Sequence, residues 1–556
     1  MGFDFLDFGF PKSGTDWKSI NGKPFITVSA KGRSNGLSTK INDGADFGPD
    51  TTLNATSPSQ TGPPYSPTLG IEEAANYVKA QYGGGKVLLK AGNYNVAPIS
   101  MPDGVDLEGE NITMHDGSMP YVTTITSISG NSTDNLISYN SYGGSVRNLY
   151  LKSNVALNSL LYFASLEDEV AYCTFTGTNV NYSINVMPIG ARIHDNAFFG
   201  TPNIAHIYHS GNGNDIYIIN NGITQEGGSN SSTVAGIYVN SNTPGQGVVN
   251  GNDISGMGIG ILLTGTGTMV NWKFIGNTFD QPLQYGLQII PNGGNLSILD
   301  FSFIGNEFDF SNINAVNIQS SSSGSLGLTS VKFTSNVINR STKDGVYISG
   351  YSSTNEVVGW DDGLTFNNDT ISDNSYGNQN VYSNVNLIGY ISGEGGIIPI
   401  QFINVINSNS VIYNGTRYAK YGYSVANEIN PNMINIIGGS IQFMQTSYID
   451  SITSAIGILK DVKIINSSGN LVYLTPTTPT VPASGTAQEN TNPYAVNVYL
   501  YGGTVTEIQI TRNGTANTVF SNATGLALSG QGYKLNPSDS ITITYTSAPT
   551  WNWLSD

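Results

Sequence analysis

The chain has 556 residues, enough to bury a large core, yet only 11% of them are charged, against roughly 25% in ordinary soluble domains. Its net charge of -17, with few lysines and arginines, would be repelled by phosphate backbones and anionic lipids, so neither nucleic-acid binding nor membrane insertion is expected. One cysteine, Cys173, excludes an internal disulfide and a multi-cysteine metal site. The first residues, MGFDFLDFGFPK, lack a basic stretch followed by an apolar run, so Sec export is not expected.

The N-terminal region contains clusters of Gly, Pro and Ser, such as SPSQTGPPYSP from Ser57, and has no regular period. We interpret residues 1–68 as an attachment arm or linker.

An ordered series of elements follows. It consists of Thr68 as helix N-cap, a helix with Ile71, Ala74, Ala75 and Val78 on one face, a GGG stop at Gly83, and strands at 86–89 and 104–108. This order resembles the N-terminal cap of pectate-lyase-like right-handed β-helices, of the type found in viral tailspikes and surface-glycan depolymerases. The DGADFG segment at Asp43 is similar to that family's opening. The resemblance implies a right-handed parallel β-helix over residues 69–474, whose first coil is covered by the helix.

A repeat in the middle of the chain supports the same fold. An asparagine recurs every 25 to 31 residues or so with a hydrophobic residue two positions on, at Asn196, Asn221, Asn252, Asn277, Asn306 and Asn336. Asparagine tolerates the positive φ of a sharp bend, and its amide can bond the asparagine one turn above, so we expect a ladder of stacked bends. The β-rich segments between them show no 3.6-residue period, which indicates a β-solenoid. Cys173 takes the asparagine position of an earlier coil and is predicted to be a buried structural thiol.

A second unit repeats between the asparagines, a short strand opened by a small residue, such as GIYV at Gly236 and GVYI at Gly345. Strand alternation predicts an outward row of Tyr208, Tyr238, Leu262, Gln288, Asn317 and Tyr347. Tyrosine and amide side chains suit sugar stacking and hydroxyl bonding, so Tyr208, Tyr238, Gln288, Asn317 and Tyr347 are predicted to bind a glycan. Ordinary solvated strand residues are the alternative. The row has no carboxylate and no arginine. The aspartates and arginine of pectate lyases are missing from it, and the chain lacks the Gly-His-Gly and Arg-x-Lys elements of polygalacturonases, so the sequence argues against both activities.

Acidic residues follow the asparagines. Asp253, Asp280, Glu307 and Asp309 are predicted to point outward, with Asp280 and Asp309 at equal places in adjacent coils, about 4.8 Å apart. Two carboxylates so close can serve as an acid and a base, and the separation falls near the range of glycosidases. A hard-cation site and plain solvated acids remain the alternatives.

Three weaker candidates lie elsewhere. The acidic run 167–169 indicates a solvated turn, and His194, His206 and His209 fall within one or two coils without the convergence that zinc requires. Trp360, followed by two aspartates, is a candidate carbohydrate-binding edge.

The C-terminal region differs in composition. Residues 475–493, rich in Pro and Thr, indicate a linker, and the alternating strands of residues 494–556 predict a small β-sandwich. That module resembles C-terminal modules of viral fibres, which implies trimer clamping or receptor contact; a plain structural cap is the alternative.

We therefore expect an extracellular virion tailspike, a homotrimer that attaches to a host-surface polysaccharide or glycoprotein and joins other virion proteins through its N-terminal arm. Whether it also cleaves the glycan is left open, and no cofactor or metal is predicted. The alternatives are a secreted polysaccharide lyase or glycoside hydrolase and a non-catalytic structural adhesin. A dozen Asn-x-Ser/Thr sites would permit glycosylation.

Overall fold

The chain folds as a right-handed parallel β-helix with a short N-terminal helix, as predicted, and the predicted C-terminal β-sandwich is a small module of five antiparallel strands. The computed structural model describes residues 19–20, 23–31, 45–110, 123–140, 143–164, 168–187, 190–210, 215–225, 231–240, 245–376, 381–393, 399–409, 412–413, 416–417, 419–426, 429, 433–444, 447–450, 456–466, 468–472, 476, 478–492, 494–512 and 514–555. The chain divides into two compact units. Unit 1 holds residues 1–292 and 304–312, and unit 2 holds residues 293–303 and 313–556.

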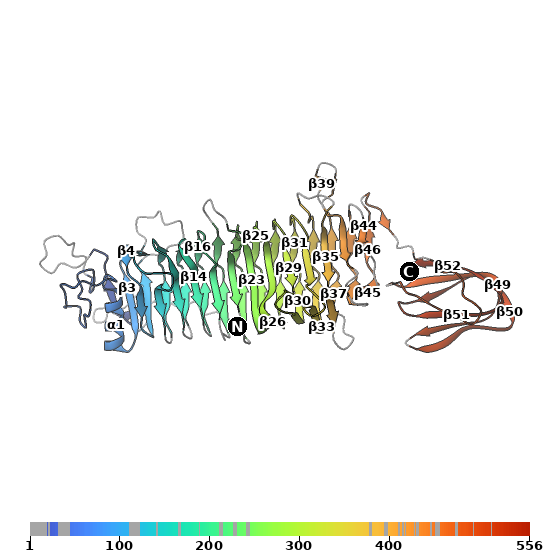
Figure 1. The fold of residues 1–556 in the computed structure, drawn as a ribbon, viewed down its shortest axis with the longest axis horizontal. Helices are drawn as coiled ribbons and strands as arrows, with labels where there is room; N and C mark the ends of the chain where they lie inside the picture. Colours follow the sequence, from blue (N-terminus) through green and yellow to red (C-terminus); the bar gives the residue numbers. More distant parts are fainter. Residues whose placement is uncertain are drawn as a thin grey trace. The chain divides into compact units, whose positions relative to one another are not determined.

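Helix α1 (Ile71–Tyr82) packs at the end of the unit 1 coils, beside strand β3 (Figure 1). It buries one face, formed by Ile71, Ala74, Ala75 and Val78, and ends at Gly83, whose left-handed backbone lets its N–H bond the Lys79 carbonyl, as expected for a glycine C-cap. The N-cap differs from the prediction: Gly70 holds that position, and Thr68, two residues earlier, accepts a bond from the Glu72 N–H at 3.3 Å. The helix therefore begins two residues later than the cap signal indicated.

Three stacks of parallel strands form the coils of unit 1 (Figure 1). We call the first stack the GxxI stack, because it contains the repeated short strands that open with a small residue, such as GIYV at Gly236. It holds β5 (Ile99–Met101), β8 (Asn135–Tyr139), β11 (Leu157–Phe163), β14 (Val180–Val186), β17 (Ala205–Ser210), β20 (Ala235–Asn240) and β23 (Ile259–Val270). The second stack holds β3 (Gly85–Leu89), β6 (Val105–Gly109), β9 (Ser145–Arg147), β12 (Glu169–Ala171), β15 (Arg192–His194), β18 (Ile216–Ile219), β21 (Gly247–Asn250) and β24 (Trp272–Ile275). The third holds β4 (Gly92–Val96), β7 (Thr123–Ser127), β10 (Tyr150–Ser153), β13 (Thr174–Thr176), β16 (Ala197–Phe199), β19 (Gly222–Thr224), β22 (Asp253–Ser255), β25 (Thr278–Asp280) and β28 (Glu307–Asp309).

Part of the segment interpreted as an arm belongs to the folded unit. Strand β2 (Lys23–Val28) pairs antiparallel with β1 (Ser19–Ile20) and parallel with β3, and Phe47 is fully buried. Asp43 and the other residues of 1–18, 21–22 and 32–44 lie outside the described residues. The apolar side chains of this strand were masked in the sequence by the surrounding Gly, Pro and Ser.

The asparagine ladder is present as predicted. Each Nδ2 donates to the Oδ1 of the next asparagine, at 3.0 Å for Asn196 to Asn221 and 2.9 Å for the three steps to Asn306. Its backbone basis differs from our expectation, because the positive φ belongs to the residue before each asparagine, as at Asn220 and Gly276. The asparagine itself remains free to aim its amide inward.

Unit 2 continues the three-strand plan. Its GxxI stack holds β29 (Val316–Gln319), β32 (Val346–Gly350), β35 (Ser383–Gly389), β41 (Tyr421–Val425) and β44 (Ser447–Asp450). The second stack holds β30 (Leu326–Thr334), β33 (Val357–Asn367), β37 (Ile400–Ile403), β42 (Ile434–Ile437) and β45 (Ile456–Lys460), with β36 (Ile391–Gly393) beside β33. The third holds β31 (Val337–Asn339), β34 (Thr370–Ser372), β38 (Ile406–Ser408), β43 (Ser440–Gln442), β46 (Lys463–Ile465) and β47 (Leu471–Val472).

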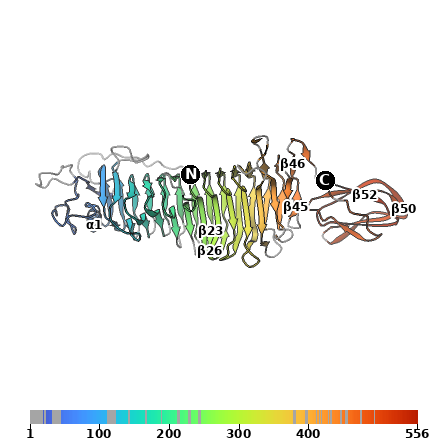
Figure 2. The ribbon, with the colours of Figure 1, turned by 45° about the horizontal axis from the view of Figure 1, so that its top comes forward.

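A few elements complete the list: β26 (Tyr285–Leu299) and β27 (Ser302–Ile304), and the hairpin β39 (Ile412–Tyr413) and β40 (Thr416–Arg417). Inside unit 2 a column of stacked rings, Phe303, Phe333, Phe366 and Phe402, has centroids 4.4, 4.6 and 5.1 Å apart. Figure 2 shows the strands of each unit running side by side.

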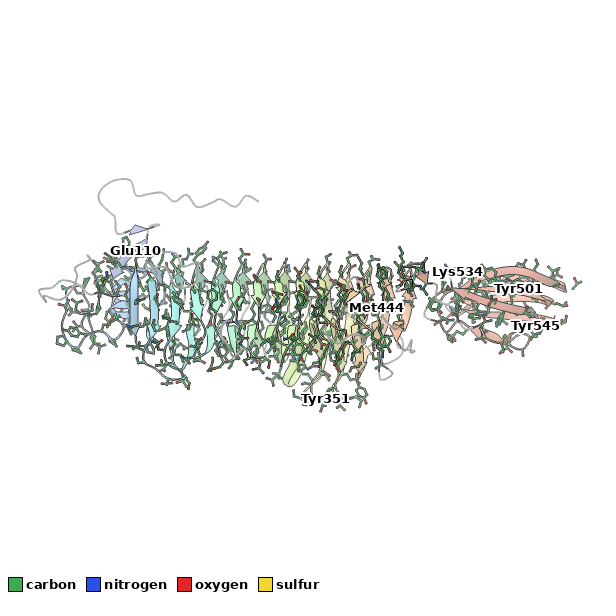
Figure 3. All side chains as sticks on the ribbon, turned by 90° about the horizontal axis from the view of Figure 1, so that it is seen from above. Glu110, Tyr351, Met444, Tyr501, Lys534 and Tyr545 are labelled. Atoms are coloured by element: carbon green, nitrogen blue, oxygen red, sulfur yellow. The ribbon has the colours of Figure 1, made fainter. Side chains whose placement is uncertain are left out.

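The C-terminal module is one antiparallel sheet that folds over its own core. It holds β48 (Ala487–Glu489), β49 (Val496–Arg512), β50 (Thr515–Leu535), β51 (Ser540–Ser547) and β52 (Thr550–Ser555). Strand β49 pairs with β52 through its first half and with β51 through its second, and Gly502 and Gly503 adopt positive φ between them. Both halves contribute to one buried cluster around Trp551 and Trp553. Tyr501 and Tyr545 lie on this sheet (Figure 3).

The module begins earlier than residue 494. Strand β48 pairs with β51, and the Trp551 indole N–H donates to the Pro479 carbonyl at 2.7 Å, so part of the Pro- and Thr-rich segment packs on the sheet. No helix in the described ranges is long and apolar enough to span a membrane.

Replacing Asn277 by Ala should lower the free energy of unfolding by about 3 kcal/mol, because the side chain is 1% exposed and the change leaves buried partners in two neighbouring coils unsatisfied. Chemical denaturation followed by circular dichroism measures this. Thr278→Ala is the control, because Thr278 is the next residue and its side chain points outward. This variant should change the free energy of unfolding by less than about 0.5 kcal/mol. Equal effects of the two variants would contradict a ladder that stabilises the coils.

Candidate functional site

An apolar patch lies on the outer face of the GxxI stack in unit 1. Strand register places Asn185, Tyr208, Tyr238 and Leu262 in one outward row, and Tyr182, Ala205, Ala235 and Ile259 in a parallel row. Tyr182, Ile204, Tyr208, Tyr238, Leu262 and Tyr285 pack partly buried over Ala205, Ala235 and Ile259. We call these six residues the tyrosine platform. Ala205 and Ala235 are small, so the rings pack closely against the strands at these two positions.

The rings of the platform stack from coil to coil. The centroids of Tyr182 and Tyr208 are 4.3 Å apart with the planes nearly parallel, and Tyr208 and Tyr238 meet edge to face at 5.1 Å. Both arrangements suit the quadrupoles of aromatic rings. The Asn240 Nδ2 donates to the Tyr208 hydroxyl at 3.3 Å. Adjacent rings therefore hold one another in place.

The hydroxyls of Tyr182 and Tyr238 stay neutral. Burial and the neighbouring phenols of Tyr208 and Tyr238 raise the pKa of Tyr182 to about 12, and burial also raises the pKa of Tyr238. A protonated phenol both donates and accepts a hydrogen bond, as a sugar hydroxyl does. The patch thus combines apolar ring faces with uncharged hydrogen-bonding groups.

All five residues predicted to bind a glycan lie on the GxxI stack, and four of them are partly exposed. Tyr208 and Tyr238 lie in the platform, and Gln288 on β26 and Tyr347 on β32 are half-buried. Asn317 is in register with Tyr347 but only 1% exposed, and its Oδ1 accepts a hydrogen bond from the Nδ2 of the buried Asn314 at 3.2 Å. The expectation that Asn317 faces solvent was wrong.

Sequence reasoning missed Tyr182 and Tyr285. Both lie outside the GxxI motif, because Tyr182 comes three residues before Asn185 and Tyr285 comes three residues before Gln288, the members of the outward row in their coils. The alanines Ala205 and Ala235, each placed directly before the motif, are the signal that could have found them, since a small residue at that place allows rings from adjacent coils to lie over it.

The acidic residues of the third stack form two rows. Asp253, Thr278 and Glu307 are in register, and Ser255, Asp280 and Asp309 are in register beside them, so the predicted pairing of Asp280 with Asp309 is correct. Asp253 and Glu307 are exposed, Asp280 is half-buried, and Asp309 is 7% exposed. A pair of carboxyl groups with unequal access to water is therefore available on adjacent strands.

A charged network occupies the second stack of unit 1, in a chain with few charges. Ion pairs join Lys86 to Glu108 and Arg147 to Glu169. The His194 imidazole lies between two carboxylates, with Nε2 2.9 Å from Glu169 and Nδ1 2.8 Å from Asp195. The bond to His194 and then the guanidinium of Arg147 lower the pKa of Glu169 to about 2, and the bond to Glu169 raises the pKa of His194.

This network replaces the solvated turn predicted at residues 167–169, of which residue 167 lies outside the described part. Strand register aligns Glu169 with Arg192 and Glu108 with Arg147, a regularity hidden in the sequence by the unequal coil lengths. Each charged side chain of this network has a partner of opposite charge, so the network has a structural role in joining neighbouring coils.

The remaining candidates do not converge. His206 and His209 are buried inside the coils, where burial lowers the pKa of His206 to about 3 and of His209 to about 4, whereas His194 is on the surface. Among the described side chains no group of three His, Cys, Asp or Glu could hold a metal ion. Cys173 is a buried thiol at a ladder position, as predicted, and burial raises its pKa to about 12. Trp360 packs over Gly327 and is half-buried.

The sequence was compared with known proteins. No protein-family model and no curated protein matches it. Among solved structures, the chain is similar to the Dettilon tailspike protein, with 13% identity over 88% of this chain and 91% of that one and a TM-score of 0.48. It is also similar to a tailspike mutant of E. coli bacteriophage HK620 in complex with a pentasaccharide (13%, 91% and 93%, TM-score 0.40) and to the A-module of mannuronan C-5 epimerase from Azotobacter vinelandii (13%, 71% and 93%, TM-score 0.38).

The charged network should give the protein a pH dependence that His194→Gln removes. A raised pKa means that the His194 contribution to stability is fully present below about pH 6.5, its ordinary pKa, and is lost as the pH rises through the folded value. The thermal midpoints of the two proteins should therefore differ most at pH 5 to 6 and converge as the pH rises to 9. A difference that is constant over this range would contradict the assignment.

Proposed function

We propose that the protein binds a neutral glycan polymer along the outer face of its GxxI stack, with the tyrosine platform as the central subsite. The single observation that carries the proposal is the platform itself, an outward-facing set of rings in consecutive coils in which the hydroxyls of Tyr182 and Tyr238 are protonated. Sugar rings present apolar C–H faces and uncharged hydroxyls, which these two kinds of group complement.

The repeat of the coils suits a repeating ligand. Adjacent strands are about 4.8 Å apart, so the platform offers ring faces at regular intervals along the stack. The outward row holds no charged side chain from Asn185 to Leu262, which favours an uncharged polymer over a uronate or sulfated one. Gln288 adds an amide in the same stack.

The proposal extends to a biological role. We assign the protein to a virion surface, as a homotrimeric tailspike that attaches to a host-surface polysaccharide or glycoprotein and joins other virion proteins through its N-terminal arm. This assignment is supported by the resemblance of the helix-capped entry to viral tailspikes and by the low charge of the surface.

Replacing Tyr208 by Ala should weaken retention on the glycan about tenfold, since it removes one stacked ring and the support of two others. Tyr208→Phe keeps the ring and should lose much less. A screen of immobilised neutral and anionic polysaccharides identifies the ligand, and the thermal midpoint confirms folding. Tyr351→Ala is the control, because Tyr351 is 61% exposed and is not one of the six platform residues. Unchanged binding by Tyr208→Ala, or loss of binding by Tyr351→Ala alone, would exclude the platform.

A second candidate function, cleavage of a glycan on the third stack, is favoured by the in-register pair Asp280 and Asp309, which lie on a different stack from the platform. Carboxyl groups of a retaining glycosidase lie about 5 Å apart, close to the spacing of adjacent strands, and Glu307 and Asp253 lie in the next row. We assign the half-buried Asp280 and the buried Asp309 as the two carboxyl groups of such a reaction, one as the nucleophile and the other as the general acid and base.

If cleavage occurs, Asp280→Asn and Asp309→Asn should each reduce the release of reducing ends at least 100-fold while glycan retention persists. Asp362→Asn, which removes an exposed carboxylate of unit 2, is the matched control and should leave the rate unchanged. Retention without reducing ends in the wild-type protein would leave a binding protein and exclude the pair as catalytic.

A further inference from the structure

The asparagine ladder follows a hydrogen-bonding rule that each full member obeys. The Oδ1 accepts from the backbone N–H and the Nδ2 of the coil before, as Asn277 does from Asn252 at 3.0 and 2.9 Å. The Nδ2 then donates twice, to the Oδ1 of the next member and to a carbonyl of the second stack, as Asn277 does to Asn306 and Val249. A member inside the ladder therefore needs two donor hydrogens.

The carbonyls that accept these bonds form a row of their own. Val170, Ile193, Ile218, Val249 and Phe274 are in register along the second stack and accept from Asn196, Asn221, Asn252, Asn277 and Asn306 in turn. In unit 2, Asn336 donates to the Phe303 carbonyl at 2.9 Å by the same rule. Phe333 stacks on Phe303 and stands one coil further in that row.

The beginning of the ladder shows how an end position departs from the rule. Cys173 has no ladder asparagine in the coil before it, since Leu149 holds that place, so it needs to accept nothing. Its thiol lies 3.6 Å from the carbonyl of Val146, the residue in register with Val170, and 3.4 Å from the carbonyl of Ala171, and it can donate to either. One donor hydrogen is enough at this end.

Asp369 holds the ladder position after Asn336, and it too is an end. Its Oδ1 accepts from the Asn336 backbone N–H at 2.7 Å and from the Asn336 Nδ2 at 2.8 Å, as the rule requires. The next coil places Val405 where a further asparagine would stand. Asp369 is fully buried. Its Oδ2 stands where an asparagine would have its amide nitrogen, and no donor within the described residues gives this oxygen a hydrogen bond.

We propose that Asp369 is held as a neutral carboxylic acid whose Oδ2–H donates to the Phe333 carbonyl, so that one aspartic acid completes the ladder and makes this coil sensitive to pH. Ionisation removes the only donor hydrogen and brings a charged oxygen against a carbonyl oxygen. An acid at this position satisfies every bond that an end member needs, whereas a carboxylate satisfies all but one.

The surroundings favour the acid form. Burial raises the pKa of Asp369 to about 6, against the weaker opposing effect of the bonds from Asn336 and of the Asn367 backbone. The titratable group that faces it is the Tyr423 phenol on β41, which is neutral and whose own pKa burial raises. In the described part of unit 2 none of the groups acting on Asp369 is a cation that would stabilise a carboxylate.

The sign of the effect follows from linkage. An unfolded aspartate releases its proton near pH 3.9, whereas folded Asp369 keeps it until about pH 6, so folding loses stability as the pH rises between these values. Above pH 6 the loss is complete and corresponds to roughly 100-fold in the folding equilibrium.

The test compares Asp369→Asn with the wild-type full chain by thermal and chemical unfolding from pH 4 to 8. The asparagine carries a donor at every pH, so the variant should match the wild type at pH 4 and exceed it by up to about 100-fold in folding equilibrium at pH 8. The other titrating groups, including Asp344 with its raised pKa, are present in both proteins and cancel in the difference. A difference independent of pH, or a variant less stable than the wild type at pH 8, would overturn the proposal.

Two further measurements make the result specific. Infrared spectroscopy at pH 5 should show a protonated-carboxyl C=O band that Asp369→Asn reduces. Asn277→Asp places the same acid inside the ladder, where two donor hydrogens are needed, so it should destabilise the protein even at pH 4. An Asn277→Asp variant as stable as the wild type at pH 4, or an unchanged infrared band, would contradict the donor-count argument.

Discussion

The fold depends on one side-chain interaction, the amide of a buried asparagine that spans two coils. Its carbonyl accepts two bonds from the coil before and its NH₂ group donates to the coil after, so it fixes the register between bends as the strand bonds fix it between strands. The sharp bend itself is made by the preceding residue, such as Gly276. With the register fixed, every outward position recurs in a straight row, and rows of like side chains become surfaces.

Those rows give the molecule its candidate site. Tyr182, Tyr208 and Tyr238 are far apart in the sequence but lie in consecutive coils over Ala205 and Ala235. The same geometry aligns Asp280 with Asp309 on another stack. The interior uses it too, as in the phenylalanine column from Phe303 to Phe402. A repeat with few charges can in this way present an aromatic, a carboxylate and an ion-paired surface on different stacks.

Period and alternation were enough to predict the solenoid, the ladder from Asn196 to Asn306, and the placement of Tyr208 and Tyr238, because these depend on local spacing. Corners were harder. Asn317 is buried and accepts a hydrogen bond from Asn314, and the ion pairs around His194 join residues from coils of unequal length. Asp369 was missed as a ladder member because its side chain is not an amide, although its Oδ1 accepts the same bonds. Strand β2 was hidden in a segment whose composition resembles a linker.

The central claim is that a neutral glycan lies on the tyrosine platform, and hydroxyl-radical footprinting with the bound polysaccharide tests it most directly. The account predicts that Tyr208 and Tyr238 become protected from oxidation, while the exposed Tyr351 and Tyr501 react as in the free protein. Protection of Tyr351 or Tyr501 with no change at the platform would contradict the account and move the binding site to another surface.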